Sequence, residues 1–244
     1  MIQLFADETG DSKFKRYFGL SLAMVKHNFY RQIKEEFQDI LLRHGWNPEI
    51  EFKGACLFSA SSGDLAVPID QRIAIAEEIL KLTASEANAR MKFLYVKHET
   101  DDPKKDYLKI LPLMIHKLLP VCGDKRQGKD LLQLCCDRRD DLTISEIRAA
   151  ALPAIQKRGY TLVEDVTMVN SNFNTVGILF ADIVGYLVAR VHTISNDAEL
   201  FQNLTQEQIE KNGKIRKLKA SKALLEHIKN LEQRQLVLKE TKSK

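Results

Sequence analysis

Cysteine, tryptophan and proline are all scarce in this sequence, which has four Cys, one Trp and six Pro among its 244 residues. Cys135 and Cys136 are adjacent in an apolar run, and none of the four cysteines belongs to a Cys-x-x-Cys pair or lies near a pair of histidines. This pattern argues against a secreted disulfide framework and against a cysteine-based zinc site. We therefore expect four buried free thiols in a reducing compartment.

Long uninterrupted apolar runs are also lacking. The first twenty residues contain three acidic and three basic residues, which is unlike the apolar core of a secretory signal. The most apolar stretch, 176–191, is shorter than the roughly 20 residues that a bilayer requires, and it contains Asp182. We therefore expect a cytoplasmic protein with no membrane segment, and a buried core helix over this stretch.

The composition predicts one domain with a basic extension. Apolar residues make up 44% and charged residues 29% of the chain, and no repeat or linker stands out. From Thr205 to Lys244 there are eleven Lys or Arg and five Asp or Glu, a charge of +6, while the rest of the chain has 26 basic and 28 acidic residues. We place the domain at 1–195 and the extension at 196–244. The extension either contacts nucleic acid phosphates or is a solvated Lys-rich helical segment.

The spacing of apolar residues predicts an α/β fold. An opening hairpin is followed by alternating strands and helices, which indicates a mixed sheet of about five strands covered by helices. The predicted strands are 1–8, 17–25, 90–97, 131–136 and 160–169, and the predicted helices are 29–42, 69–84, 106–122, 145–157 and 175–192. Two more helices are expected beyond Asn196, and their apolar stripe either docks on the domain or serves a homodimer or protein partner.

Four carboxylates lie beside strongly apolar sequence. Asp7 and Asp137 each end a predicted strand, Glu51 lies in an irregular segment, and Asp182 lies within the most apolar helix. A buried charge costs several kcal/mol or more unless it is paired or bound to a metal. Along its own helix Asp182 has only Arg190, two turns away, as a partner.

Each of these acids also has a purely structural interpretation. Asp7 could begin a turn, Glu51 could face solvent, Asp137 could cap the next segment, and Asp182 could form a buried salt bridge. Taken together, however, they suit Mg²⁺ or Mn²⁺, which bind carboxylate oxygens and retain several waters. Two such ions can activate a water and stabilise the leaving oxygen of a phosphodiester.

At these residues the sequence resembles domain-of-unknown-function family 3800, which is grouped with the ribonuclease H-like superfamily. The segment FADETGD at 5–11 is similar to that family's D-E-S-G-D strand end, with Thr9 in place of Ser. EFKG at 51–54 is similar to its E-x-K-G element, and Asp137 matches its strand-terminal Asp. Ser171 followed by GILFADI at 177–183 is similar to its last motif, although Leu179 replaces the usual Gln. The resemblance covers about 1–192.

The resemblance implies a ribonuclease H-like fold that gathers the four acids at one edge of the sheet around two Mg²⁺ or Mn²⁺ ions. Asp7 would bridge the two metals, Asp137 and Asp182 would each hold one, and Glu51 would add a ligand or orient the water. Lys53 would contact the scissile phosphate or form a salt bridge with one of the acids. The supporting residues in this scheme are Glu8, Asp11 and Ser171.

The leading hypothesis is a metal-dependent nuclease whose basic extension, Arg138 and Arg139 contact the nucleic acid backbone. The alternative is a non-catalytic module that binds nucleic acid or protein, for instance in a phage-defence or toxin-like system, and retains the fold with an idle site. Hydrolysis of a nucleotide or another phosphate ester by the same metals is a third hypothesis. The sequence has no glycine-rich phosphate loop to support nucleoside triphosphate binding.

Overall fold

The structure, a computed structural model, describes residues 1–10, 17–59, 61–82, 91–123, 130–187 and 205. The predicted supporting residue Asp11 lies outside these residues, as does Arg190. The predicted extension 196–244 also lies outside them, except for Thr205, so its helices and its partners stay predictions.

A mixed sheet of six strands forms the centre of the domain, in the order β3-β2-β1-β4-β5, with β6 also paired to β4. Strands β1 (Ile2–Gly10), β2 (Tyr17–Lys26) and β3 (Met91–Glu99) are antiparallel neighbours. Strand β4 (Asp130–Asp137) runs parallel to β1 and also to β5 (Tyr160–Leu162) and β6 (Thr167–Val169). The predicted α/β class and the opening hairpin are thus confirmed.

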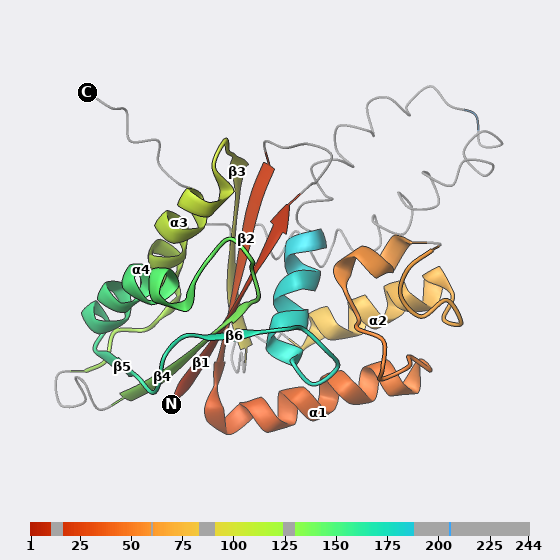
Figure 1. The fold of residues 1–244 in the computed structure, drawn as a ribbon. Coiled ribbons are helices and arrows are strands. Elements are labelled where there is room, and N and C mark those ends of the chain that lie inside the picture. The colour runs from red at the N-terminus through yellow and green to blue at the C-terminus, as the bar shows by residue number, and fades with distance from the viewer. Residues whose placement is uncertain (11–16, 60, 83–90, 124–129, 188–204, 206–244) are drawn as a thin grey trace.

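Helices cover both faces of this sheet (Figure 1). Helices α1 (His27–Arg43), α2 (Ile69–Lys81) and a helix over 176–187 lie on one face, together with the short 3₁₀ helix η1 (Gly54–Phe58). Helices α3 (Pro103–Leu118) and α4 (Ile144–Lys157) lie on the other face. Alternate residues of β1 divide between the two resulting cores, since Phe5 belongs to the first and Leu4 and Ala6 to the second.

The structure differs from the prediction in two elements. The single strand expected at 160–169 is two short strands, because the chain bends at 163–165, where Asp165 Oδ1 accepts a hydrogen bond of 2.8 Å from the backbone N–H of Val166. Helix α3 begins and ends earlier than expected. Asp102 caps its first turn by accepting a 3.0 Å bond from the Lys105 N–H, and Pro120 follows its end.

Two further predictions concern the cysteines and membrane-spanning segments. All four cysteines are buried and free, as expected. Within the described ranges, no helix combines the length and the apolar character that a bilayer span requires.

The segment between η1 and α2 is irregular, and Arg72 of α2 organises it. The guanidinium of Arg72 is 2% exposed and donates five hydrogen bonds of 2.7 to 3.0 Å to backbone carbonyls. The acceptors are Val67, Cys56, Ser59, Ser62 and Asp64. A buried cation therefore supplies donors to the carbonyl groups of this segment, of which Cys56 and Asp64 also accept a backbone N–H.

Replacing Arg72 with Lys should destabilise the protein by about 2 to 4 kcal/mol, because an ammonium has at most three donors and leaves buried carbonyls unpaired. Urea unfolding of the full chain measures this loss. The Arg31→Lys variant is the control, since Arg31 is 90% exposed and pairs only with Glu35 in its own helix. Equal stability of the two variants would contradict the role of Arg72.

Candidate active site

Asp7 and Asp137 lie side by side at the carboxyl edge of the parallel strands. The last paired residues of the β1–β4 ladder are Ala6 and Cys136, and each is followed directly by one of these aspartates. The carboxyl ends of parallel strands share one edge of a sheet, which is the usual place for a binding site in an α/β fold. Asp7 is 5% exposed.

Glycines bring the helix over 176–187 close to this edge. A Cβ added at Gly177 would overlap the ring of Phe5, and one added at Gly185 would overlap the side chain of Thr9. The eight residue steps from Gly177 to Gly185 span about 12 Å along a helix, and the four steps from Phe5 to Thr9 span about 13 Å along a strand. The helix therefore follows β1. Asp182 lies between Gly177 and Gly185, and Asp7 lies between Phe5 and Thr9, which places the two acids near each other.

The segment before η1 supplies the other polar groups. The backbone N–H of Gly54 donates a 2.5 Å hydrogen bond to Asp182 Oδ2. Lys53 Nζ lies 3.1 Å from Glu51 Oε2, and its side chain is 46% exposed. Of the two roles predicted for Lys53, the salt bridge is therefore present. The hydrogen bond from the Gly54 N–H was not predicted from the sequence, although Gly54 directly follows Glu51, Phe52 and Lys53.

The carboxylates lie close enough to influence one another's charge. Burial raises the pKa of Asp7 well above its ordinary value, and the negative charges of Asp182 and Asp137 raise it further. Burial also raises the pKa of Asp182 to about 6, with the Gly54 hydrogen bond and the charge of Lys53 acting in the opposite direction. The charges of Glu51 and Asp137 add to the pKa of Asp182.

Asp137 is influenced by the same groups. Burial raises its pKa, and the negative charge of Glu51 raises it further. The backbone N–H of Arg138, the charge of Lys53 and a side-chain hydrogen bond from Ser171 lower it. Ser171, predicted as a supporting residue, thus contacts Asp137.

Three buried oxygens near this cluster have no hydrogen-bond partner among the described residues: Thr9 Oγ1, Ser21 Oγ and Glu51 Oε1. Ser21 is 2% exposed and lies directly opposite Asp7 in the β1–β2 register. Buried polar atoms are normally paired, so these oxygens could accept a further donor or bind a cation. The sequence analysis did not identify Ser21, and its only signal is a hydroxyl within the apolar run 17–25.

Glu8 is not part of this cluster. Neighbouring strand residues point to opposite faces, so Glu8 lies on the face of Leu4 and Ala6, where it forms an ion pair with Arg139. Burial raises its pKa to about 7, and Arg139 acts against this shift. Arg139 was predicted to contact nucleic acid. The structure argues against this contact, because the Arg139 side chain is 9% exposed and bound to Glu8 and Asp141. Arg138 is exposed.

The donor set suits a hard divalent cation, since carboxylate oxygens are the ligands that Mg²⁺ and Mn²⁺ prefer, and Glu51 Oε1 has no other partner. In the part of the chain that the structure describes, no three His, Cys, Asp or Glu side chains have the spacing of a formed metal site. The acids are therefore gathered but not arranged as a closed coordination cage.

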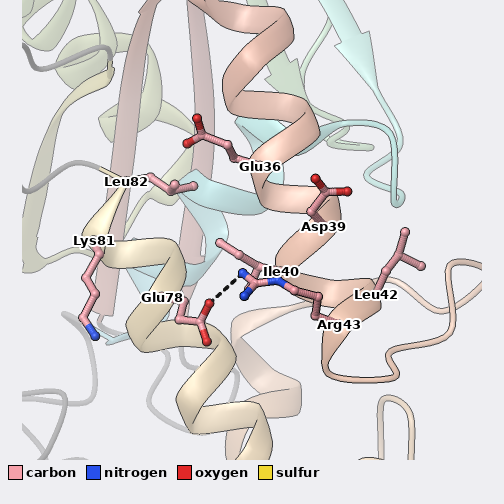
Figure 2. A pocket seen from close by; sticks show the side chains of 8 residues that line it. All are labelled: Glu36, Asp39, Ile40, Leu42, Arg43, Glu78, Lys81 and Leu82. Atoms are coloured by element: carbon pink, nitrogen blue, oxygen red, sulfur yellow. Dashed lines mark hydrogen bonds and ion pairs between the residues drawn. The ribbon is translucent and has the colours of Figure 1, made fainter.

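A separate pocket lies between α1 and α2 (Figure 2). Arg43 and Glu78 form an ion pair of 2.9 Å across it. None of the residues predicted for the active site lines this pocket; those that do are Glu36, Asp39, Ile40, Leu42, Arg43, Glu78, Lys81 and Leu82.

The chain matches no protein-family model and no curated protein. It is similar to the solved structure of ribonuclease H2 from Pyrococcus horikoshii OT3, with a TM-score of 0.44 and 10% identity over 84% of this chain and 80% of that one. It is also similar to a chain of the PCNA:RNase HII complex from Archaeoglobus fulgidus, with a TM-score of 0.43 and 10% identity over 100% of this chain and 98% of that one. Similarity at this level assigns no activity and no residue role. The fold class predicted from the sequence is confirmed by the mixed sheet of this chain, independently of these two structures.

Replacing Asp182 with Asn should stabilise the metal-free protein at pH 8. The pKa of Asp182 in the folded protein, about 6, lies above the ordinary value of 3.8. The protonated side chain therefore contributes fully to the free energy of unfolding below pH 3.8, and this contribution is lost as the pH rises through 6. At about 1.4 kcal/mol per pKa unit, removing the ionised group should raise the free energy of unfolding by about 1 to 3 kcal/mol at pH 8.

Chemical denaturation at pH 4 and pH 8 with EDTA measures this difference. The Asp101→Asn variant is the control, because Asp101 is exposed, and its stability should change little at either pH. An Asp182→Asn protein that is less stable than the wild type at pH 8 would show that the ionised carboxylate is not under repulsion.

Proposed function

We propose that this chain is a divalent-metal-dependent nuclease with a ribonuclease H-like fold, which hydrolyses phosphodiester bonds in nucleic acid. The observation that supports this proposal is the gathering of Asp7, Glu51, Asp137 and Asp182, from four separate segments, at the carboxyl edge of the parallel strands. Mutual repulsion among these carboxylates favours a shared cation. The resemblance to domain-of-unknown-function family 3800 leads to the same four residues.

Asp7, Asp137, Asp182 and Glu51 would hold Mg²⁺ or Mn²⁺ through their carboxylate oxygens. When bound, the metal supplies Lewis acidity toward a phosphate oxygen and lowers the pKa of water. The protein orients the ligands: the Gly54 N–H fixes one oxygen of Asp182, and Ser171 fixes Asp137. Such hydrogen bonds to metal-binding carboxylates keep them in a productive orientation.

Lys53 has a second role in this proposal. Its ammonium pairs with Glu51 while about half of its side chain remains in contact with water. A phosphate group entering above the carboxylates would meet this positive charge first. Lys53 and the exposed Arg138 are therefore the described basic residues that we expect to contact the nucleic acid backbone, together with the basic extension.

The test is cleavage of labelled RNA, single-stranded DNA and duplex DNA by the purified full chain with Mg²⁺ or Mn²⁺. We expect cleavage of at least one substrate, its loss in EDTA, and a decrease of at least 100-fold in the Asp7→Asn and Asp182→Asn variants. The Asp101→Asn variant should retain wild-type activity. Equal cleavage by all variants would indicate a contaminating nuclease and contradict the assignment.

The alternative is a non-catalytic module that binds nucleic acid or protein. The lack of a formed three-ligand group among the residues described favours this alternative. Calorimetric titration with Mn²⁺ distinguishes the two functions, because the nuclease requires saturable metal binding that Asp7→Asn abolishes. A module with an idle site would bind nucleic acid equally well in EDTA.

A further inference from the structure

An ion-pair network lies on the sheet face opposite the four acids. Arg139 follows Asp137 by two residues, and Glu8 directly follows Asp7. Arg139 Nη1 donates to Glu8 Oε2, so the two side chains join the ends of β1 and β4. The network therefore uses sequence neighbours of Asp7 and Asp137, but it lies on the other face of the sheet.

Arg139 is held from three directions. Besides Glu8, its Nε and Nη2 atoms donate to the two carboxylate oxygens of Asp141 at 2.8 and 2.7 Å. Its Cζ atom lies 5.2 Å from the ring centre of Tyr107 in α3. A planar guanidinium with bidentate and stacking contacts loses little further freedom, which makes it a rigid connection.

This connection lies where the backbone ladder between β1 and β4 has ended. The last paired residues are Ala6 and Cys136, whereas on the other side of β4 the pairing with β6 continues to Asp137, which lies opposite Val169. Asp7 and Asp137 therefore lie directly after the last paired residues of β1 and β4, where the repulsion between their like charges favours a separation of the two strands. The opposite charges of Glu8 and Arg139 act across the same two strand ends and oppose this separation.

We propose that Glu8 and Arg139 are positioning residues, which fix the separation of Asp7 and Asp137 and thereby the affinity of the site for a divalent cation. This inference rests on the proposed function. It explains why a salt bridge with a nearly buried arginine lies behind the acids, on the face that faces α3 and α4.

Two single variants separate positioning from a general effect of charge. Glu8→Gln removes a negative charge and Arg139→Gln removes a positive charge near the cation. If only long-range electrostatics mattered, the first would weaken Mn²⁺ binding and the second would strengthen it. If the ion pair positions the aspartates, both variants should weaken binding by about 10-fold, as is typical when residues that orient metal ligands are lost.

The measurement is the Kd for Mn²⁺, by calorimetry on the full chain. The double variant should lose no more affinity than either single variant, because both remove the same contact. The Arg139→Lys variant keeps the charge but loses the bidentate contact, so it should also weaken binding; it serves as the test if Arg139→Gln does not fold. Arg148→Gln is the matched control, since Arg148 lies in α4, is 54% exposed and pairs loosely with Asp165 at 3.8 Å.

Hydrogen exchange provides a second readout. Exchange should increase in peptides covering the ends of β1 and β4 in both single variants, and it should not change in α2. Opposite shifts in Mn²⁺ affinity, or wild-type affinity in Arg139→Lys, would overturn the positioning role while the proposed function stands. A wild-type chain that binds no Mn²⁺ would overturn the proposed function and the positioning role with it.

Discussion

Repulsion between carboxylates that are partly shielded from water is the constraint on which the functional end of this domain depends. Burial raises the pKa of Asp7, Asp137 and Asp182, because it removes water that would otherwise stabilise and screen their charges. The charges of Asp182 and Asp137 raise the pKa of Asp7 further, and that of Asp137 raises the pKa of Asp182. A fold that gathers such groups requires compensating interactions. The described ones are the Gly54 N–H, the Lys53 ammonium and the ion pair behind the sheet. Each of these contacts involves one or two side chains only, so the acids remain at the edge without all being neutralised.

The gathering itself results from backbone packing. Parallel pairing of β1 with β4 places Asp7 beside Asp137, and the small residues Gly177 and Gly185 allow the helix over 176–187 to approach β1. Gly54 also lies very close to this helix, since a Cβ at residue 54 would overlap the side chain of Tyr186. Larger side chains at Gly177 or Gly185 would move the helix and Asp182 away from the strand, because a Cβ there would lie 2.3 Å from a side-chain atom of Phe5 or Thr9. The chemistry of the edge is therefore linked to the packing of one helix.

Much of this arrangement could be predicted from the sequence. Strand ends and helix periodicity depend on local residues, so the hairpin, the mixed sheet and the positions of Asp7 and Asp137 followed from them, and a buried charge within an apolar helix indicated Asp182. The rest depends on tertiary structure. The partner of Asp182 is a backbone N–H from a segment 128 residues away, Ser21 is significant only through strand register, and Glu8 differs from Asp7 only in the face to which it points. The bend that divides β5 from β6 also has no periodic signal.

The most direct test of the central claim is a crystal structure of the full chain soaked in Mn²⁺, with anomalous scattering measured at the manganese edge. The account predicts an anomalous peak between Asp7, Asp137 and Asp182, within coordination distance of carboxylate oxygens and near Glu51 Oε1. Well-ordered carboxylates with no peak between them at saturating Mn²⁺, or an arginine bound in their place, would contradict it.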